Sequence, residues 1–96
     1  MRAQAESQNQ RIEFIKGELA MCSTFTVLAT IKYVAGNPDS AERSMGHAEE
    51  VYTTVLPLVS YPQYSKHLSV EVIQEFTAAL ELLRKSLDGL IRKVRK

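Results

Sequence analysis

STFTVLATIKYVAG, residues 23–36, fits both a β-strand and part of an α-helix, and the choice between them decides the fold. Its odd-numbered positions from Phe25 to Tyr33 are apolar, and most of the positions between them are Thr or Lys, which is the two-residue period of a half-buried strand. A strand needs a partner, but the only other β-prone run, residues 51–59, contains Pro57 and has a helical stripe of its own. We therefore expect a helix.

As a helix, this stretch continues an apolar stripe that begins further upstream. The stripe contains Ile12, Ile15, Leu19, Cys22, Thr26, Ala29 and Tyr33, and beside it lie Phe14, Met21, Phe25 and Leu28. The β-branched residues lower the helix propensity by a few tenths of a kcal/mol each, so packing against other elements must stabilise the helix. The pattern predicts a helix over residues 8–35, with residues 1–7 frayed.

Residues 36–40 separate this helix from a second one. Gly36 suits the left-handed position that ends a helix, Asn37 can cap the next helix, and Pro38 fits its first turn. The second helix is predicted over residues 38–59, with a kink or an early end near Leu56 because Pro57 removes a backbone hydrogen bond. Its apolar face consists of Ala41, Met45, Ala48, Tyr52, Val55 and Val59.

A third helix is predicted over residues 70–94, after a connection at residues 60–69. Pro62 should hold Tyr61 in an extended conformation, and Ser69 can serve as the N-cap of the third helix. Leu68 and Ile73 are spaced for a hydrophobic staple. The apolar seam follows at steps of three and four, at Ile73, Phe76, Leu80, Leu83, Leu87, Leu90 and Val94, and residues 95–96 are expected to fray.

The chain of 96 residues is expected to form one all-α domain, an antiparallel up-down-up three-helix bundle that dimerisation would complete. The single cysteine, Cys22, excludes an intramolecular disulfide, and we expect a cytoplasmic protein. The apolar stretch after residue 18 is too short and too rich in hydroxyl groups for a membrane span, and mostly polar residues precede it. No transmembrane segment is therefore expected.

Two groups of apolar residues are candidates for a partner interface. Val27, Ile31 and Val34 lie away from the main stripe of the first helix, so they either form an interface or are covered by the other helices, with the threonines bonded to their own helix. A symmetric homodimer is the commonest way to bury such a strip. Tyr61 and Tyr64 either anchor a partner or close the end of the core.

Charge is unevenly distributed along the chain. Residues 37–60 carry one basic and four acidic side chains, whereas residues 61–96 carry seven basic and four acidic ones. The basic end, Arg92, Lys93, Arg95 and Lys96, could bind nucleic acid or an acidic membrane surface. It could equally complement the helix dipole and the acidic start of the second helix at Asp39 and Glu42. Nucleic acid is not the expected partner, because no stacking or groove-reading motif accompanies these residues.

No pattern in the sequence indicates catalysis. His47 and Glu50 have a spacing that places them on one face of a helix, but the order and number of residues do not match a carboxylate-bridged metal site. His67 belongs to the connection, and Cys22 is expected to be an inert core thiol. We therefore expect no enzyme and no cofactor, but a helical protein that acts through association with itself or another protein. The alternative is a regulator that binds an anionic partner through its basic end.

Overall fold

The computed structural model describes residues 2–95, with side chains from residue 8 onward, and these residues form helices and connections without a strand. The three long helices are α1 (Arg2–Val34), α2 (Pro38–Ser60) and α4 (Val70–Val94), and the single-turn helix α3 (Pro62–Ser65) lies between the last two. The all-α prediction is confirmed, and residues 23–34 belong to α1. The strand interpretation of this stretch is wrong.

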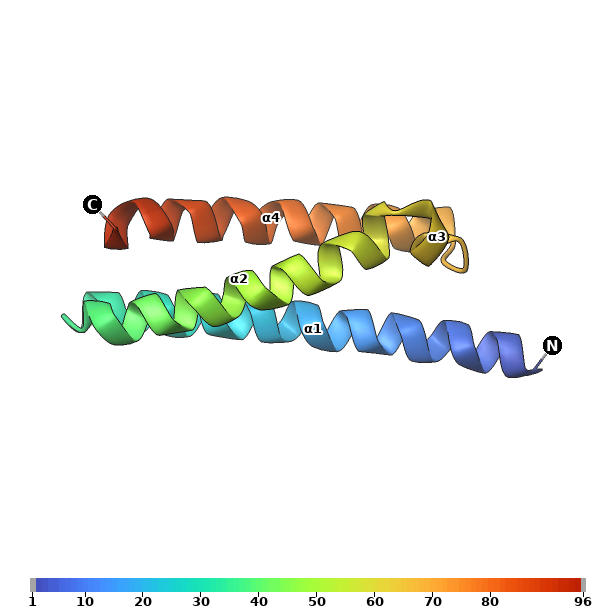
Figure 1. Ribbon diagram of the computed structural model, residues 1–96, viewed down its shortest axis with the longest axis horizontal. Helices are drawn as coiled ribbons and strands as arrows, with labels where there is room; N and C mark the ends of the chain where they lie inside the picture. Colours follow the sequence, from blue (N-terminus) through green and yellow to red (C-terminus); the bar gives the residue numbers. More distant parts are fainter. Residues whose placement is uncertain (1, 96) are drawn as a thin grey trace.

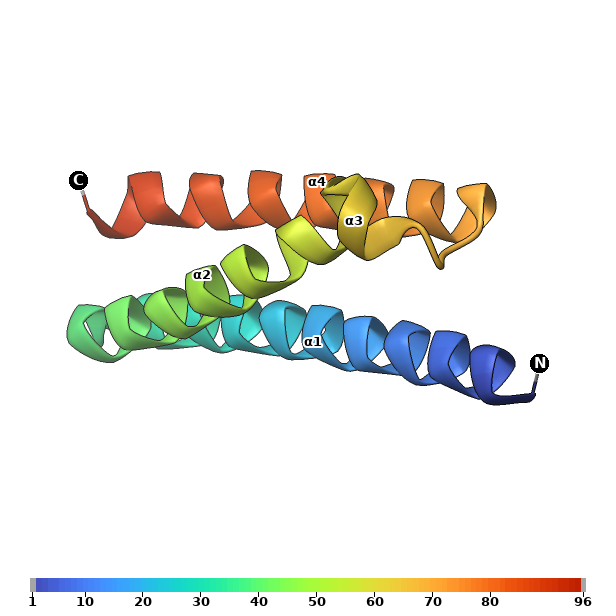
Figure 2. The ribbon, with the colours of Figure 1, turned by 45° about the vertical axis from the view of Figure 1, so that its right-hand side comes forward.

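The molecule is a rod of 53 × 18 × 17 Å. Its length follows from α1, because 33 residues at about 1.5 Å each span about 50 Å. Helix α2 runs opposite to α1 and α4 along the rod (Figures 1 and 2), as expected for short connections. Contacts between the long helices are uneven, since α1 packs mainly against α2 and much less against α4.

The predicted end of α1 and start of α2 are confirmed by their local hydrogen bonds. Gly36 has a φ of 82°, and the amides of Gly36 and Asn37 donate to the carbonyls of Tyr33 and Lys32, which is a Schellman motif. The side chain of Asn37 accepts from the Ser40 amide at 3.4 Å, and Pro38 begins α2.

The start of α4 also forms as predicted. The Ser69 hydroxyl accepts a hydrogen bond from the Val72 amide at 3.2 Å. Tyr61 is extended before Pro62, with φ −87° and ψ 127°. Leu68 is buried, and Ile73 packs against the same hydrophobic cluster, as a hydrophobic staple requires.

One helix boundary differs from the prediction, and one expected alternative does not occur. Helix α1 begins at Arg2, where residues 1–7 were expected to fray, because no Gly or Pro interrupts this segment and Ala, Gln and Glu favour helix. Helix α2 ends at Ser60, one residue beyond the predicted range, so it continues through Pro57 and the alternative of an early end near Leu56 is wrong. A proline so close to the C-terminus removes only one hydrogen bond, and the Tyr61 amide still donates to the Pro57 carbonyl at 3.0 Å.

Small side chains hold α1 and α2 together. The buried residues of α1 include Cys22 and Ala29, seven positions apart, and those of α2 include Ala41 and Ala48 with the same spacing. The Cys22 thiol donates to the Ala48 carbonyl at 3.4 Å, so the two backbones approach closely at this level. Such a spacing keeps the same residues in contact along two long helices.

Two hydrophobic clusters fill the interior along the rod. One lies toward α3 and contains Ile15, Val55, Val59, Leu68, Phe76 and Leu80. The other lies toward the chain's C-terminal end and contains Cys22, Ala29, Met45, Ala48, Leu87 and Leu90. Val51 and Tyr52 of α2 pack against both clusters, which makes the interior continuous.

Leu87→Ala is expected to lower the free energy of unfolding by about 2–5 kcal/mol, because Leu87 is fully buried and its loss leaves a cavity. The matched control is Leu82→Ala on the same helix, whose side chain is 68% exposed and should change the free energy by less than about 0.5 kcal/mol. Urea denaturation followed by circular dichroism measures both. Equal effects of the two substitutions would contradict the packing of α4.

Two glycine substitutions should change stability in opposite directions. Gly36→Ala is expected to destabilise the protein by about 1 kcal/mol, because a side chain at φ 82° is strained even though no atom obstructs it. Gly46→Ala inside α2 also meets open space but has a helical backbone, so it should stabilise by up to about 1 kcal/mol. Thermal melting of both variants gives the comparison, and a stabilising Gly36→Ala would contradict the Schellman turn.

Candidate association surface

The side of α1 that faces away from α2 exposes large apolar side chains. Val27, Ile31 and Val34 are 54%, 57% and 79% exposed. The hydroxyls of Thr26 and Thr30 do bond to carbonyls one turn earlier, at 2.8 and 3.0 Å, but the other helices do not cover the strip. The interpretation of α1 as a helix wedged deeply among the others is therefore wrong.

This exposed surface is larger than the three residues predicted from the sequence. Phe14 and Met21 are about half-exposed, and Leu28 is also exposed. With Gly17, Thr24 and Ile31 they form a repeat of seven residues, which we call the outer face of α1: Phe14, Gly17, Met21, Thr24, Leu28 and Ile31, flanked by Val27 and Val34. The spacing is that of the a and d positions of a coiled coil.

The middle of α1 carries no charged side chain. Residues 19–31 contain no charged side chain, while Glu18 precedes them and Lys32 follows them. Both border residues are partly buried, and the Lys32 ammonium donates to the Ser44 hydroxyl at 3.0 Å. A continuous apolar strip of this kind is typical of an interaction surface.

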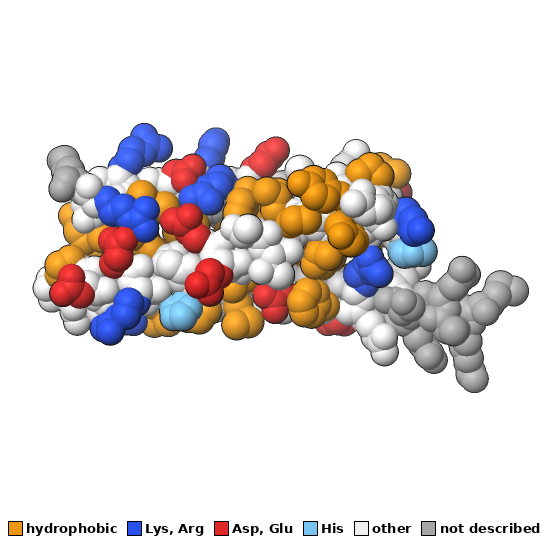
Figure 3. Space-filling model, viewed as in Figure 1, with side chains coloured by type: hydrophobic (Ala, Val, Ile, Leu, Met, Phe, Trp, Pro, Cys, Tyr) orange, Lys and Arg blue, Asp and Glu red, His pale blue; other side chains and the backbone are white. Residues whose placement is uncertain are grey.

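The tyrosines of the connection are exposed and do not close the core. The rings of Tyr61 and Tyr64 stack on each other with centroids 6.4 Å apart. Leu68 and Ser65 are the buried residues here, so the expectation that the rings complete the interior is wrong. Figure 3 shows hydrophobic side chains gathered near α3 and charged ones interspersed toward the C-terminal end of the rod.

Tyr64 borders an open groove at the end of the outer face. The groove has a volume of about 390 Å³ and is lined by Gln10, Arg11, Phe14, Leu58 and Tyr64. The Arg11 guanidinium donates to the Tyr64 carbonyl at 2.7 Å, which ties the start of α1 to α3. The structure therefore joins two predicted interface regions, the tyrosine loop and the apolar side of α1, through Phe14.

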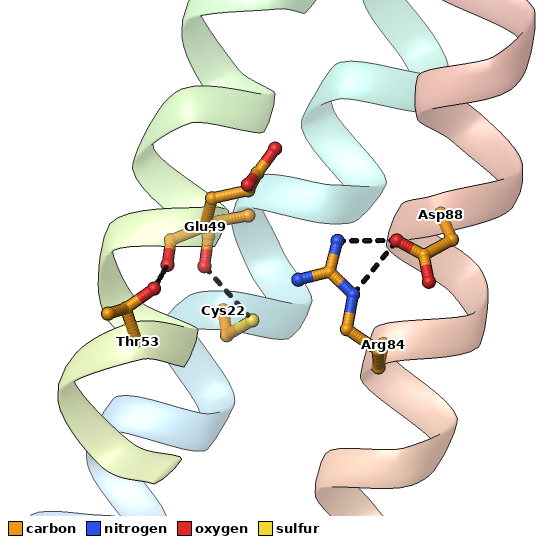
Figure 4. A network of polar contacts seen from close by, with 6 residues as sticks. Cys22, Glu49, Thr53, Arg84 and Asp88 are labelled. Atoms are coloured by element: carbon orange, nitrogen blue, oxygen red, sulfur yellow. Dashed lines mark hydrogen bonds and ion pairs between the residues drawn. The ribbon is translucent and has the colours of Figure 1, made fainter. Parts of the chain in front are cut away.

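Polar contacts at the middle of the rod surround Cys22 (Figure 4). Cys22 is buried, and burial raises the pKa of its thiol, although the charge of Arg84 and a hydrogen bond with Thr26 partly oppose this. Two nitrogens of Arg84 donate to one oxygen of Asp88 at 2.9 and 2.6 Å, and its guanidinium lies 5.0 Å from the ring centre of Tyr52. Burial alone would lower the pKa of Arg84, but Asp88 raises it.

The histidines are not gathered with other potential metal ligands among the described side chains. His47 is exposed, and its ring lies 5.1 Å from that of Phe25. His67 is exposed in the connection before α4.

The basic end is partly engaged within the chain. Arg95 donates to Glu42 at 2.6 Å, so the contact with the acidic start of α2 exists in the structure. Arg92 and Lys93 are exposed in the last turn of α4, and Lys96 lies outside the described residues. Binding of an anionic partner at this end stays a prediction.

Helix α1 also has the length and composition of a membrane span between Gln8 and Val34. The same properties occur in core helices of soluble proteins, and here one side of the helix is packed against α2. The length and hydropathy of α1 are therefore compatible with either protein or lipid against the outer face.

The Cys22 thiol should be unreactive in the folded protein. Because burial raises its pKa, the reactive thiolate is disfavoured at neutral pH, and reagent access is blocked. We expect reaction with a thiol reagent such as dithionitrobenzoate to be at least about a hundredfold slower in buffer than in denaturing urea. Rapid labelling of the folded protein would contradict the burial of Cys22 between α1 and α2.

Comparisons of the chain with protein-family models, with curated proteins and with solved structures found no match. No function is therefore transferred from a relative. The feature that best indicates a function is the outer face of α1, which is apolar, exposed and regularly spaced.

Proposed function

We propose that the protein is a non-enzymatic association module that forms a homodimer through the outer face of α1. The observation that carries the proposal is the exposed repeat of large apolar residues, Phe14, Met21, Leu28 and Ile31, on the side of α1 opposite α2. A coiled-coil contact over about three heptads would bury this surface. Two copies would complete the helical bundle, because α1 would then be packed on both sides.

The repeat of the outer face favours a second copy of the same chain. Its positions are spaced so that an antiparallel pair brings Phe14 of each copy level with Ile31 of the other, and Met21 level with Thr24. Glu18 and Lys32 belong to the side of α1 nearer α2, because both are partly buried and the Lys32 ammonium donates to Ser44. The antiparallel homodimer thus superposes the two apolar strips.

The fold of one copy is compatible with such a contact. The outer face includes Gly17 and Thr24, whose small side chains allow close approach, while Val27 and Ile31 project beside Thr24. In an isologous contact both copies contribute the same residues, so a short strip on each copy makes a sizeable interface. The buried stripe of α1 stays against α2 and needs no rearrangement.

The double substitution Val27→Glu and Ile31→Glu is expected to convert the dimer to a monomer. Both positions are exposed in one copy, so the folded monomer tolerates the charges, whereas the dimer would bury four unpaired carboxylates. Light scattering after size exclusion, over a range of concentrations, measures the mass. Circular dichroism should show unchanged helicity.

Leu82→Glu provides the matched control. Leu82 is 68% exposed but lies on α4, so its substitution should leave the dimer intact. A wild-type protein that is monomeric at every concentration would overturn the proposal, as would a dimer that survives both charges on α1. A monomer that sediments with phosphatidylcholine vesicles would instead identify a lipid bilayer as the neighbour of the outer face.

A further inference from the structure

We infer that the groove lined by Arg11, Phe14 and Tyr64 receives the turn between α1 and α2 of the second copy, with Asp39 of that copy paired with Arg11. This inference rests on the proposed homodimer and deepens it. In the dimer the groove of each copy then forms a contact in addition to the outer face, one at each end of the paired α1 helices.

The register of the antiparallel pair places the turn at the groove. The register that superposes the two outer faces brings Ile31 of one copy level with Phe14 of the other, so Val34, at the start of the turn, lies level with Arg11. Gly36 is the left-handed residue of the turn, and α2 begins two residues later. By symmetry, both copies place a turn at the groove of the other copy.

The groove and the turn have complementary surfaces. The groove offers the half-exposed ring of Phe14, the ring of Tyr64 and the side chain of Leu58 as apolar walls. The turn offers Val34, which is the most exposed of the large hydrophobic residues, and the ring of Pro38. The groove is open rather than enclosed, as required for a protein segment that enters from the side.

The charges at the two sites are also complementary. Arg11 uses one nitrogen to donate to the Tyr64 carbonyl, and a guanidinium carries five N–H donors in all. Asp39 is exposed in the first turn of α2, and no ion pair of either residue occurs among the described side chains. A carboxylate on the arriving turn would pair with a guanidinium that the Tyr64 carbonyl already orients.

Charge reversal in separate copies tests the inference. One protein carries Arg11→Glu and the other Asp39→Lys. Each homodimer then has two like-charged contacts, whereas the mixed dimer has one reversed pair of opposite charges and one native-like pair. We expect each homodimer to dissociate about fivefold more readily than the wild type, and the mixed dimer to recover much of the wild-type affinity. Native mass spectrometry of an equimolar mixture should show the mixed dimer above its statistical share of one half.

The mixture separates a contact between copies from an effect within one copy. Each substitution can also lower the stability of its own copy, either by breaking the Arg11–Tyr64 hydrogen bond or by placing a positive charge near the start of α2. Such a loss of stability is the same in homodimers and mixed dimers, so it does not favour the mixed dimer. The control pair is Lys66→Glu and Glu71→Lys, which are exposed and lie off the outer face, and its mixture should stay statistical.

The two proposals fail in different ways. A statistical mixture from copies that still dimerise would overturn the placement of the turn and leave the dimer through the outer face standing. A wild-type protein without dimers would overturn both. A preference for the mixed dimer in the control pair would also overturn the inference, because the effect would then be one of general charge.

Discussion

The close packing of α1 against α2 through small side chains is the constraint on which the rest of the structure depends. Cys22 and Ala29 on α1 lie against the helix that carries Ala48, and the thiol reaches a backbone carbonyl of α2. Small residues at the contact let two long helices approach closely. The larger apolar residues of α1, such as Met21 and Ile31, are then left on the opposite side. The outer face is thus a consequence of how the inner face packs.

The features that were predictable from the sequence are mostly local. Gly36, Asn37 and Ser69 end or begin helices through hydrogen bonds with residues three to five positions away, so their residue types contain most of the information. The start of α1 was not predicted, and the expectation of an early end near Leu56 was wrong as one of two alternatives, because both depend on how far an established helix propagates. Adding a residue to a formed helix costs far less than starting one.

The candidate site was only partly predictable, for a different reason. Val27 and Ile31 were placed on the outer side of α1, and they are exposed there. Phe14, Met21 and Leu28 were assigned beside the buried stripe, but these three residues of one seven-residue repeat are exposed. The spacing of the hydrophobic residues shows that α1 has two apolar sides. Which of the two sides is buried depends on how well it packs against α2. The groove requires a contact between residues 53 positions apart, which no local pattern contains.

Helix α1 therefore has two apolar faces, and a single copy of the chain buries only one of them. In the monomer the second face stays in water, so the fold lacks the favourable free energy of burying Met21, Leu28 and Ile31. In the proposed dimer this free energy becomes available only on association, so the stability of the fold increases with protein concentration. The same face therefore links stability to association, because the contact that completes the packing of α1 is also the contact between copies.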